Sequence, residues 1–465
     1  MADHAYSPRL RTGVLLCGTG TAGAYQAGVL RALAEAGVKV DVVAGHGPGV
    51  MNALCAGIDG VGKVSDPAGP WTDARLGRAY RWRAALRAAA LGLGAAGVIL
   101  LSPLAILLFA SLVYAVSVLA ALANLPTTAA RLVAWYQQTL GVLFDPPILP
   151  TIMPRALVLA MLVVAAVLAV AAFRAFRAER SRRRLRGAFW WRLVGTPLEA
   201  HEPGALQVDT LWLLARGASN DPRPAPEEVG ARYVDLLTEN LGQPGFREVV
   251  IAVHDVDGRR DLVGAVLTPE ATDTFARRRP GAALREAEAI ELTGPGRVHV
   301  VDFLLGSTRL PIATEPHFAT LSTDTYWQGE THRLCDRPEL AQRLVDELAR
   351  LGVQQLIVAS PAALPAVAHG LRSRPVDLRA RIGEFVRSVE TAALDDAVGS
   401  SAGRFTRVFV VRPDHNPVGP FDFDGVYDEA SDRQRTILEL MKSGYDDAYR
   451  LFIEPAVAAG DTVDL

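Results

Sequence analysis

The chain is poor in cysteine and has no excess of either charge. Its 465 residues include three cysteines, 48 Lys and Arg, and 50 Asp and Glu, so the formal net charge is −2. Three cysteines cannot supply a disulfide framework, which excludes the class of small disulfide-stabilised domains. Proteins that bind nucleic acid normally carry a clear basic excess, and this chain has none. The composition therefore gives no reason to expect nucleic acid as a partner.

Charge is also missing locally, in two long apolar stretches. Residues 88–124 contain no charged side chain, and a second uncharged stretch covers the 18 residues 156–173. At about 1.5 Å per residue, such a helix is about 27 Å long, close to the ~30 Å hydrocarbon core of a bilayer. We predict two membrane spans, over about 95–122 and 154–174, the first one a single long helix kinked at Ser102-Pro103. The alternative is a helical hairpin buried in a large soluble core.

Arginine brackets the apolar region on both sides. Before it stand Arg75, Arg78, Arg81, Arg83 and Arg87, and after it stand Arg174, Arg177, Arg180, Arg182, Arg183, Arg184, Arg186 and Arg192. Arginines close to span ends remain on the cytoplasmic side. We therefore expect a two-span membrane protein whose soluble parts are cytoplasmic, in a bacterial inner membrane. Anionic lipid is the favoured partner of these arginines, and nucleic acid is the alternative.

Outside the apolar region, short apolar stretches alternate with helical patterns. Residues 13–17 and 38–44 are predicted strands, and each is followed by a small-residue turn and then a predicted helix, over 24–37 and 50–58. This order predicts an α/β domain with a mainly parallel sheet.

The alternation continues after the apolar region. We predict strands over 247–254, 262–267, 298–304, 355–360 and 406–411, and helices over 271–289, 338–351, 380–398 and 431–457. The apolar hairpin thus divides one α/β domain. We place its N-terminal part at 1–80, the hairpin at 81–192, its C-terminal part at 193–372, and an α/β tail at 373–465.

The first turn is rich in glycine. Gly18, Gly20 and Gly23 follow a strand and precede a helix, in the G-x-G-x-x-G pattern of dinucleotide-binding loops. That interpretation requires an acidic residue at the end of the second strand, to hold the ribose. Asp41 stands before Val42, at the start of the strand rather than its end. The sequence allows three functions, and a membrane-tethered nucleotide-binding protein is the weakest of them.

The second turn has the form of a nucleophile elbow, G-x-S-x-G. It comprises the five consecutive residues Gly45, His46, Gly47, Pro48 and Gly49 between a strand and a helix. Together with the first turn, it resembles the patatin-like phospholipase family. CGTGTAGAYQAGVLRAL at 17–33 resembles the family's oxyanion loop, DVVAGHGPGVMNAL at 41–54 resembles its elbow, and 304–358 resembles the stretch carrying its Asp-Gly motif.

This resemblance implies a patatin-like three-layer α/β domain and a lipid acyl hydrolase that uses a Ser–Asp dyad. The departures from the family pattern fall on the dyad. Gly47 stands at the position of the family's Ser, and Gln328 aligns with its Asp. In the oxyanion loop Thr19 replaces a Gly, and Ala22 replaces the family's Arg. A glycine offers no nucleophile and a neutral amide is no base, so no catalytic residue is intact.

We therefore predict a membrane-anchored, patatin-like protein of lipid metabolism or lipid sensing that is catalytically impaired. The leading alternative is an active lipid acyl hydrolase with an atypical site. The expected partners are membrane lipid, a lipid or acyl ligand in the vestigial site, and another protein. We expect no cofactor and no metal, since the histidines lack ligand spacing, and we expect Cys17 and Cys55 to be small core residues.

Overall fold

A computed structural model of the chain describes residues 6–145, 147, 152–179, 195–276, 287–322, 329–364 and 377–460. The chain forms two compact units. Unit 1 comprises Met1–Arg81 and Leu198–Leu465, and unit 2 comprises Trp82–Pro197. Each unit is described by itself.

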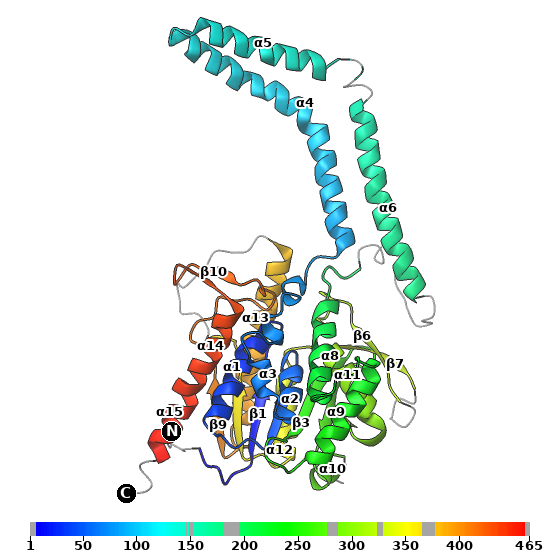
Figure 1. The fold of residues 1–465 in the computed structure, drawn as a ribbon, viewed down its shortest axis with the longest axis vertical. Helices are drawn as coiled ribbons and strands as arrows, with labels where there is room; N and C mark the ends of the chain where they lie inside the picture. The colour runs from blue at the N-terminus through cyan, green and yellow to red at the C-terminus, as the bar shows by residue number, and fades with distance from the viewer. Residues whose placement is uncertain are drawn as a thin grey trace. The chain divides into compact units, whose positions relative to one another are not determined.

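Unit 1 is built on a mixed sheet (Figure 1) with the strand order β5-β4-β3-β2-β1-β8-β9, to which β6 and β7 are added beside β3. The described strands are β1 Thr12–Leu16, β2 Val42–Gly45, β3 Glu248–Asp255, β4 Arg260–Val266, β5 Ala287–Glu291, β6 His317–Thr320, β7 Thr331–Cys335, β8 Gln355–Ala359 and β9 Arg407–Val411. The pairs β1–β2, β1–β8, β2–β3, β4–β5 and β8–β9 are parallel. Strand β3 is antiparallel to β4 and to β7.

Helices cover both faces of this sheet. They are α1 Ala22–Glu35, α2 Gly49–Gly57, α3 Val61–Val64, α8 His201–Ala215, α9 Pro226–Asn240, α10 Pro269–Ala276, α11 Val300–Ser307, α12 Leu340–Arg350, α13 Leu378–Ser401, α14 Ile437–Ala448 and α15 Glu454–Gly460. Val250 belongs to the core cluster that contains Leu344 of α12. Its neighbour Val249 lies against Gly57 of α2, on the opposite face. The predicted α/β class with a mostly parallel sheet is confirmed.

The sheet brings the two predicted turns together. In the parallel pair β1–β2, Leu16 is opposite Gly45, and the His46 N–H donates to the Leu16 carbonyl. The glycine loop therefore leaves β1 beside the elbow that leaves β2, at the carboxyl edge of the sheet. In open α/β sheets this edge is where ligands bind.

Three predicted elements are wrong at their boundaries or in type. The predicted strand 298–304 is mostly helix α11, because its apolar residues Val300, Val301, Phe303 and Leu304 are all buried along one short helix. Of the predicted helix 271–289, the part up to Ala276 belongs to α10, residues 277–286 lie outside the described residues, and Ala287 already belongs to β5. The predicted helix 431–457 begins only at Ile437, where Thr436 and Glu439 form a capping box. Before it, β10 Val426–Asp428 and β11 Arg433–Arg435 pair as a hairpin.

The described residues of unit 2 form the helices α4 Ala84–Leu122, α5 Pro126–Leu143 and α6 Met153–Glu179. The 39 residues of α4 form one helix with Pro103 inside it, as predicted. Figure 1 shows α4 bent near its middle, which a proline inside a helix explains, since it removes a hydrogen bond and crowds the preceding turn. Before the bend α4 packs against α6, where Gly92 allows the close approach of Val164. After it α4 packs against α5, where the Tyr136 hydroxyl donates to the Ile106 carbonyl at 2.6 Å.

Two helices of unit 2 are long and apolar enough to cross a membrane. They are Ala84–Leu122 and Met153–Arg174, and only 11% and 6% of their most apolar windows are buried. A core helix of a soluble domain is mostly buried, so the alternative of a hairpin in a soluble core does not fit the described residues.

Candidate functional site

The elbow between β2 and α2 is centred on Gly47. This residue has a φ of +55°, a backbone conformation that residues with side chains adopt at a cost. A Cβ at this position would lie 2.5 Å from the Gly18 carbonyl oxygen and 2.7 Å from Oδ2 of Asp336. The space for a side chain is therefore already occupied. Both the backbone conformation and the packing favour glycine, and the elbow presents no nucleophile.

Asp336 is the carboxylate next to the elbow, and the sequence analysis did not select it. It directly follows β7 and is completely buried, with Oδ1 3.0 Å from Nδ1 of the buried His46. An acidic residue at the end of a buried strand was the available signal. The family resemblance points to an Asp followed by a Gly, whereas Asp336 is followed by Arg337. Gln328, which aligns with the family's Asp, lies outside the described residues and remains a prediction.

His46 and Asp336 form an ion pair. Burial alone lowers the pKa of His46, but the charge and hydrogen bond of Asp336, with a smaller effect from the Cys17 thiol, raise this pKa well above its ordinary value. The imidazole is therefore protonated near neutral pH. A carboxylate that already balances a buried cation is poorly placed to act as a general base.

The tail helix α13 adds a further carboxyl group to this cluster. Glu390 is buried, and burial raises its pKa to about 7, partly offset by the charge of His46. Four buried polar atoms of the cluster have no hydrogen-bond partner among the described residues, namely Oγ1 of Thr19, Nε2 of His46, Oδ2 of Asp336 and Oε1 of Glu390. Such groups are costly in a folded protein and concentrate at functional sites.

The glycine loop lies beside this cluster, but a segment of the tail covers it. Gly18 and Gly20 have φ values of +127° and +58°, and Gly23 lies in the first turn of α1 beside the Trp71 ring. The N–H of Thr21 donates to the Pro420 carbonyl at 3.0 Å. A Cβ at Gly20 would lie 1.8 Å from that same oxygen, so only glycine permits the contact. One donor of the loop is therefore already bound within the chain.

A small apolar cavity adjoins the loop and the elbow. Its volume is about 20 Å³, and its lining includes Gly20, Pro48, Met51, Trp71, Tyr80 and Phe423. A water molecule fits a cavity of this size, whereas an acyl chain does not. The cavity is thus a small apolar space next to the glycine loop.

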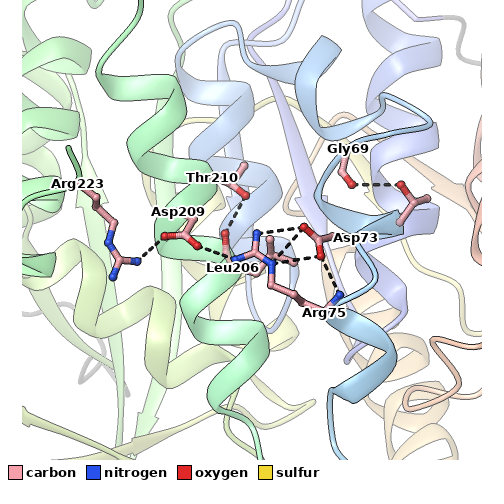
Figure 2. Close-up of polar contacts among 8 residues, drawn as sticks. Gly69, Asp73, Arg75, Leu206, Asp209, Thr210 and Arg223 are labelled. Carbon is pink, nitrogen blue, oxygen red and sulfur yellow. Dashed lines mark hydrogen bonds and ion pairs between the residues drawn. The ribbon is translucent and has the colours of Figure 1, made fainter. Parts of the chain in front are cut away.

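An ion-pair network stabilises the wall of this cavity (Figure 2). Arg75 binds Asp73 and reaches Oδ2 of Asp209 on α8 at 2.8 Å, while Arg223 pairs with the other oxygen of Asp209. The network ties the segment that carries Trp71 to α8, which carries Leu206 of the cavity lining. The sequence analysis counted Arg75 among the membrane-flanking arginines, but in the structure it pairs within unit 1.

The structure separates Asp41 from the glycine loop. Asp41 precedes β2 and accepts a hydrogen bond from the Thr12 N–H at the start of β1, at the amino edge of the sheet. The glycine loop follows β1 at the carboxyl edge. Asp41 is therefore not placed to hold the ribose of a dinucleotide on this loop.

The cysteines lie in the core. Cys17, Cys55 and Cys335 are free and buried, and burial raises the pKa values of Cys55 and Cys335. A buried thiol with a raised pKa is a poor nucleophile. Within the described parts of the chain, no group of three or more His, Cys, Asp or Glu residues is arranged to hold a metal ion.

Comparison with known proteins adds little to this geometry. No family model and no curated protein matches the chain. Among solved structures, the chain is similar to VipD from Legionella pneumophila, with a TM-score of 0.32 and 13% sequence identity, over 96% of this chain and 67% of that one. A similarity at this level says nothing about activity.

Proposed function

We propose that this chain is a membrane-anchored, patatin-like protein that binds an acyl lipid without hydrolysing it. Gly47 is the observation that carries the proposal, because it leaves the elbow without a nucleophile and with no space for one. The pairing of Asp336 with His46 supports it further, since the nearest carboxylate balances a buried cation. Loss of the nucleophile alone reduces kcat of a hydrolase by about a million-fold.

The ligand class is supported by the surroundings of the glycine loop. A loop of backbone N–H groups at a helix N-terminus suits a carbonyl or carboxylate oxygen. The apolar lining by Met51, Trp71 and Tyr80 suits a hydrocarbon chain. The two exposed apolar helices of unit 2 support a membrane anchor. Arginine at both ends of unit 2, at Arg83 and Arg177, supports a cytoplasmic position for unit 1.

A fluorophosphonate probe tests the absence of chemistry on the purified, detergent-solubilised chain. We expect no covalent labelling and no release of product from a fatty-acyl ester above the rate of buffer alone. An active serine lipase in the same detergent is the positive control, and D336A is the matched variant. Labelling at one residue of unit 1, or ester hydrolysis that D336A abolishes, would contradict the proposal.

A further inference from the structure

The tail segment 416–423 makes the contacts with the glycine loop. It lies between β9 and β10 and crosses the start of α1. There the Thr21 hydroxyl donates to the Gly419 carbonyl at 2.8 Å, and the Thr21 N–H donates to the Pro420 carbonyl at 3.0 Å. An N–H group that already binds a carbonyl of the chain cannot at the same time bind the oxygen of a ligand. The first contact that a ligand needs is thus made by the protein itself.

The same segment also fills apolar space. The Phe423 ring stacks on Tyr80 with centroids 6.2 Å apart, and Phe423 lines the cavity together with Gly20 and Trp71. The Phe421 ring also contacts the Tyr80 ring, with centroids 5.0 Å apart. A carbonyl on the loop and an apolar group in the adjoining cavity are the two features that an acyl compound would present.

Two arginines of α13 hold the segment through its backbone. Arg387 donates to the carbonyls of Pro417 and Val418, and Arg379 donates to the carbonyls of Phe421 and Tyr80. The segment belongs to no strand of the described sheet, so these contacts can be released without breaking the strand pairing of unit 1.

We propose that residues 416–423 are an internal plug, in which the Pro420 carbonyl and the Phe423 ring occupy the positions that the carbonyl and chain of an acyl ligand would take. This inference rests on the proposed acyl-binding function of the same site. It adds a regulatory element, because the ligand enters only when the tail leaves. The ligand is a compound with a carbonyl or carboxylate oxygen next to a hydrocarbon chain, which describes both a free fatty acid and the acyl chain of a phospholipid.

Two measurements on the full chain in detergent micelles test the plug. The release variant is R379A/R387A, and the matched control is R404A/R412A, which removes two tail arginines paired with Asp346 and Asp395 instead. The first measurement is hydrogen exchange of the Thr21 amide. We expect it to accelerate more than tenfold in the release variant alone, while the β1 amides of Val14 and Leu15 keep their protection.

The second measurement is photolabelling with a diazirine-bearing fatty acid and, separately, with a phospholipid carrying the same photoreactive chain. We expect labelling of Met51 and Trp71 to rise at least fivefold in the release variant, and the more effective reagent identifies the source of the ligand. The variant F423A removes only the half-buried ring, leaves both arginines in place, and is expected to raise the labelling as well. F423A therefore still tests the plug if the variant R379A/R387A fails to fold.

The outcomes separate the plug from the proposed function. Equal and detectable labelling of the wild type and the release variants, or unchanged exchange at Thr21 with β1 still protected, would overturn the plug. Accelerated exchange at Thr21 with no labelling in any protein would support a releasable tail and overturn acyl binding.

Discussion

Unit 1 buries polar and charged side chains around Gly47, whereas unit 2 exposes apolar side chains along α4 and α6. His46, Asp336 and Glu390 are at most 8% exposed, while Leu108 of α4 and Leu162 of α6 are 66% and 61% exposed. Both arrangements are costly in water, the first because charges lose hydration and the second because hydrocarbon contacts solvent. Each unit therefore has its own reason to depart from the usual pattern of polar side chains outside and apolar side chains inside. A specific polar cluster accounts for the first, and the membrane anchor that we propose would account for the second.

The largest effect is expected from placing charged side chains on the apolar surface of unit 2. We expect the double substitution L159R/L162R in α6 to release much of the protein from membranes at alkaline pH, because each arginine at the centre of a span costs about 2.5–3.5 kcal/mol. Extraction with alkaline carbonate, followed by sedimentation, measures the released fraction. T127R on the exposed face of α5 is the control and should remain with the membrane. Retention of the double variant at wild-type levels would show that α6 does not lie in lipid.

Next in size is the loss of the carboxylate in unit 1. We expect D336A to lower the free energy of unfolding by about 3–5 kcal/mol, because the buried His46 loses the partner that holds its proton and must give up either that proton or its pairing. Urea denaturation of the detergent-solubilised chain, followed by tryptophan fluorescence, measures the change. The control D257A removes a half-exposed pair with Arg333 and should cost about 1 kcal/mol or less. Equal losses in the two variants would mean that the buried pair contributes no more to the free energy of unfolding than the half-exposed pair does.

The third expected effect concerns pH and Glu390. Burial raises the pKa of Glu390 to about 7, above the ordinary value of 4.5 for a glutamate, so the folded protein binds this proton more tightly than the unfolded chain does. Its favourable contribution is therefore present below about pH 4.5 and is lost as the pH rises toward 7, a change of about 3 kcal/mol.

E390Q removes this titration. We expect the variant to be more stable than the wild type at pH 8 and to show little difference at pH 4. Thermal unfolding of both proteins at the two pH values measures the effect. The control E384Q changes an exposed carboxyl on the same helix and should follow the wild type. A wild-type pH dependence in E390Q would place the titrating group elsewhere.

The fold was largely predictable from the sequence where the chain pattern is local. The predicted order of strand, small-residue turn and helix is present as β2 Val42–Gly45 and α2 Gly49–Gly57, although the strand begins later than the predicted 38–44. The uncharged stretch that contains Pro103 forms one helix for the same reason. The predicted strand at 298–304 was wrong because a short run of buried apolar residues fits a strand or a helix equally well, and only packing distinguishes them.

The candidate site was predictable only in part. The missing nucleophile at Gly47 is visible in the sequence because the turn around it has a recognisable form. Asp336 and Glu390 were missed because neither lies in a motif, and each reaches the elbow from a distant element. Distances in sequence of 290 residues, as between His46 and Asp336, carry no local signal.

The sequence by itself determined the apolar helices, the glycine loop and a turn without a nucleophile, because each depends on residues that are neighbours in the chain. The tertiary structure alone decided which carboxylate lies beside Gly47 and which carbonyl binds the Thr21 amide. Those contacts arise when β7, α13 and the segment 416–423 converge on the carboxyl edge of the sheet. Their free energy depends on burial and on distance in space, which a linear pattern does not encode.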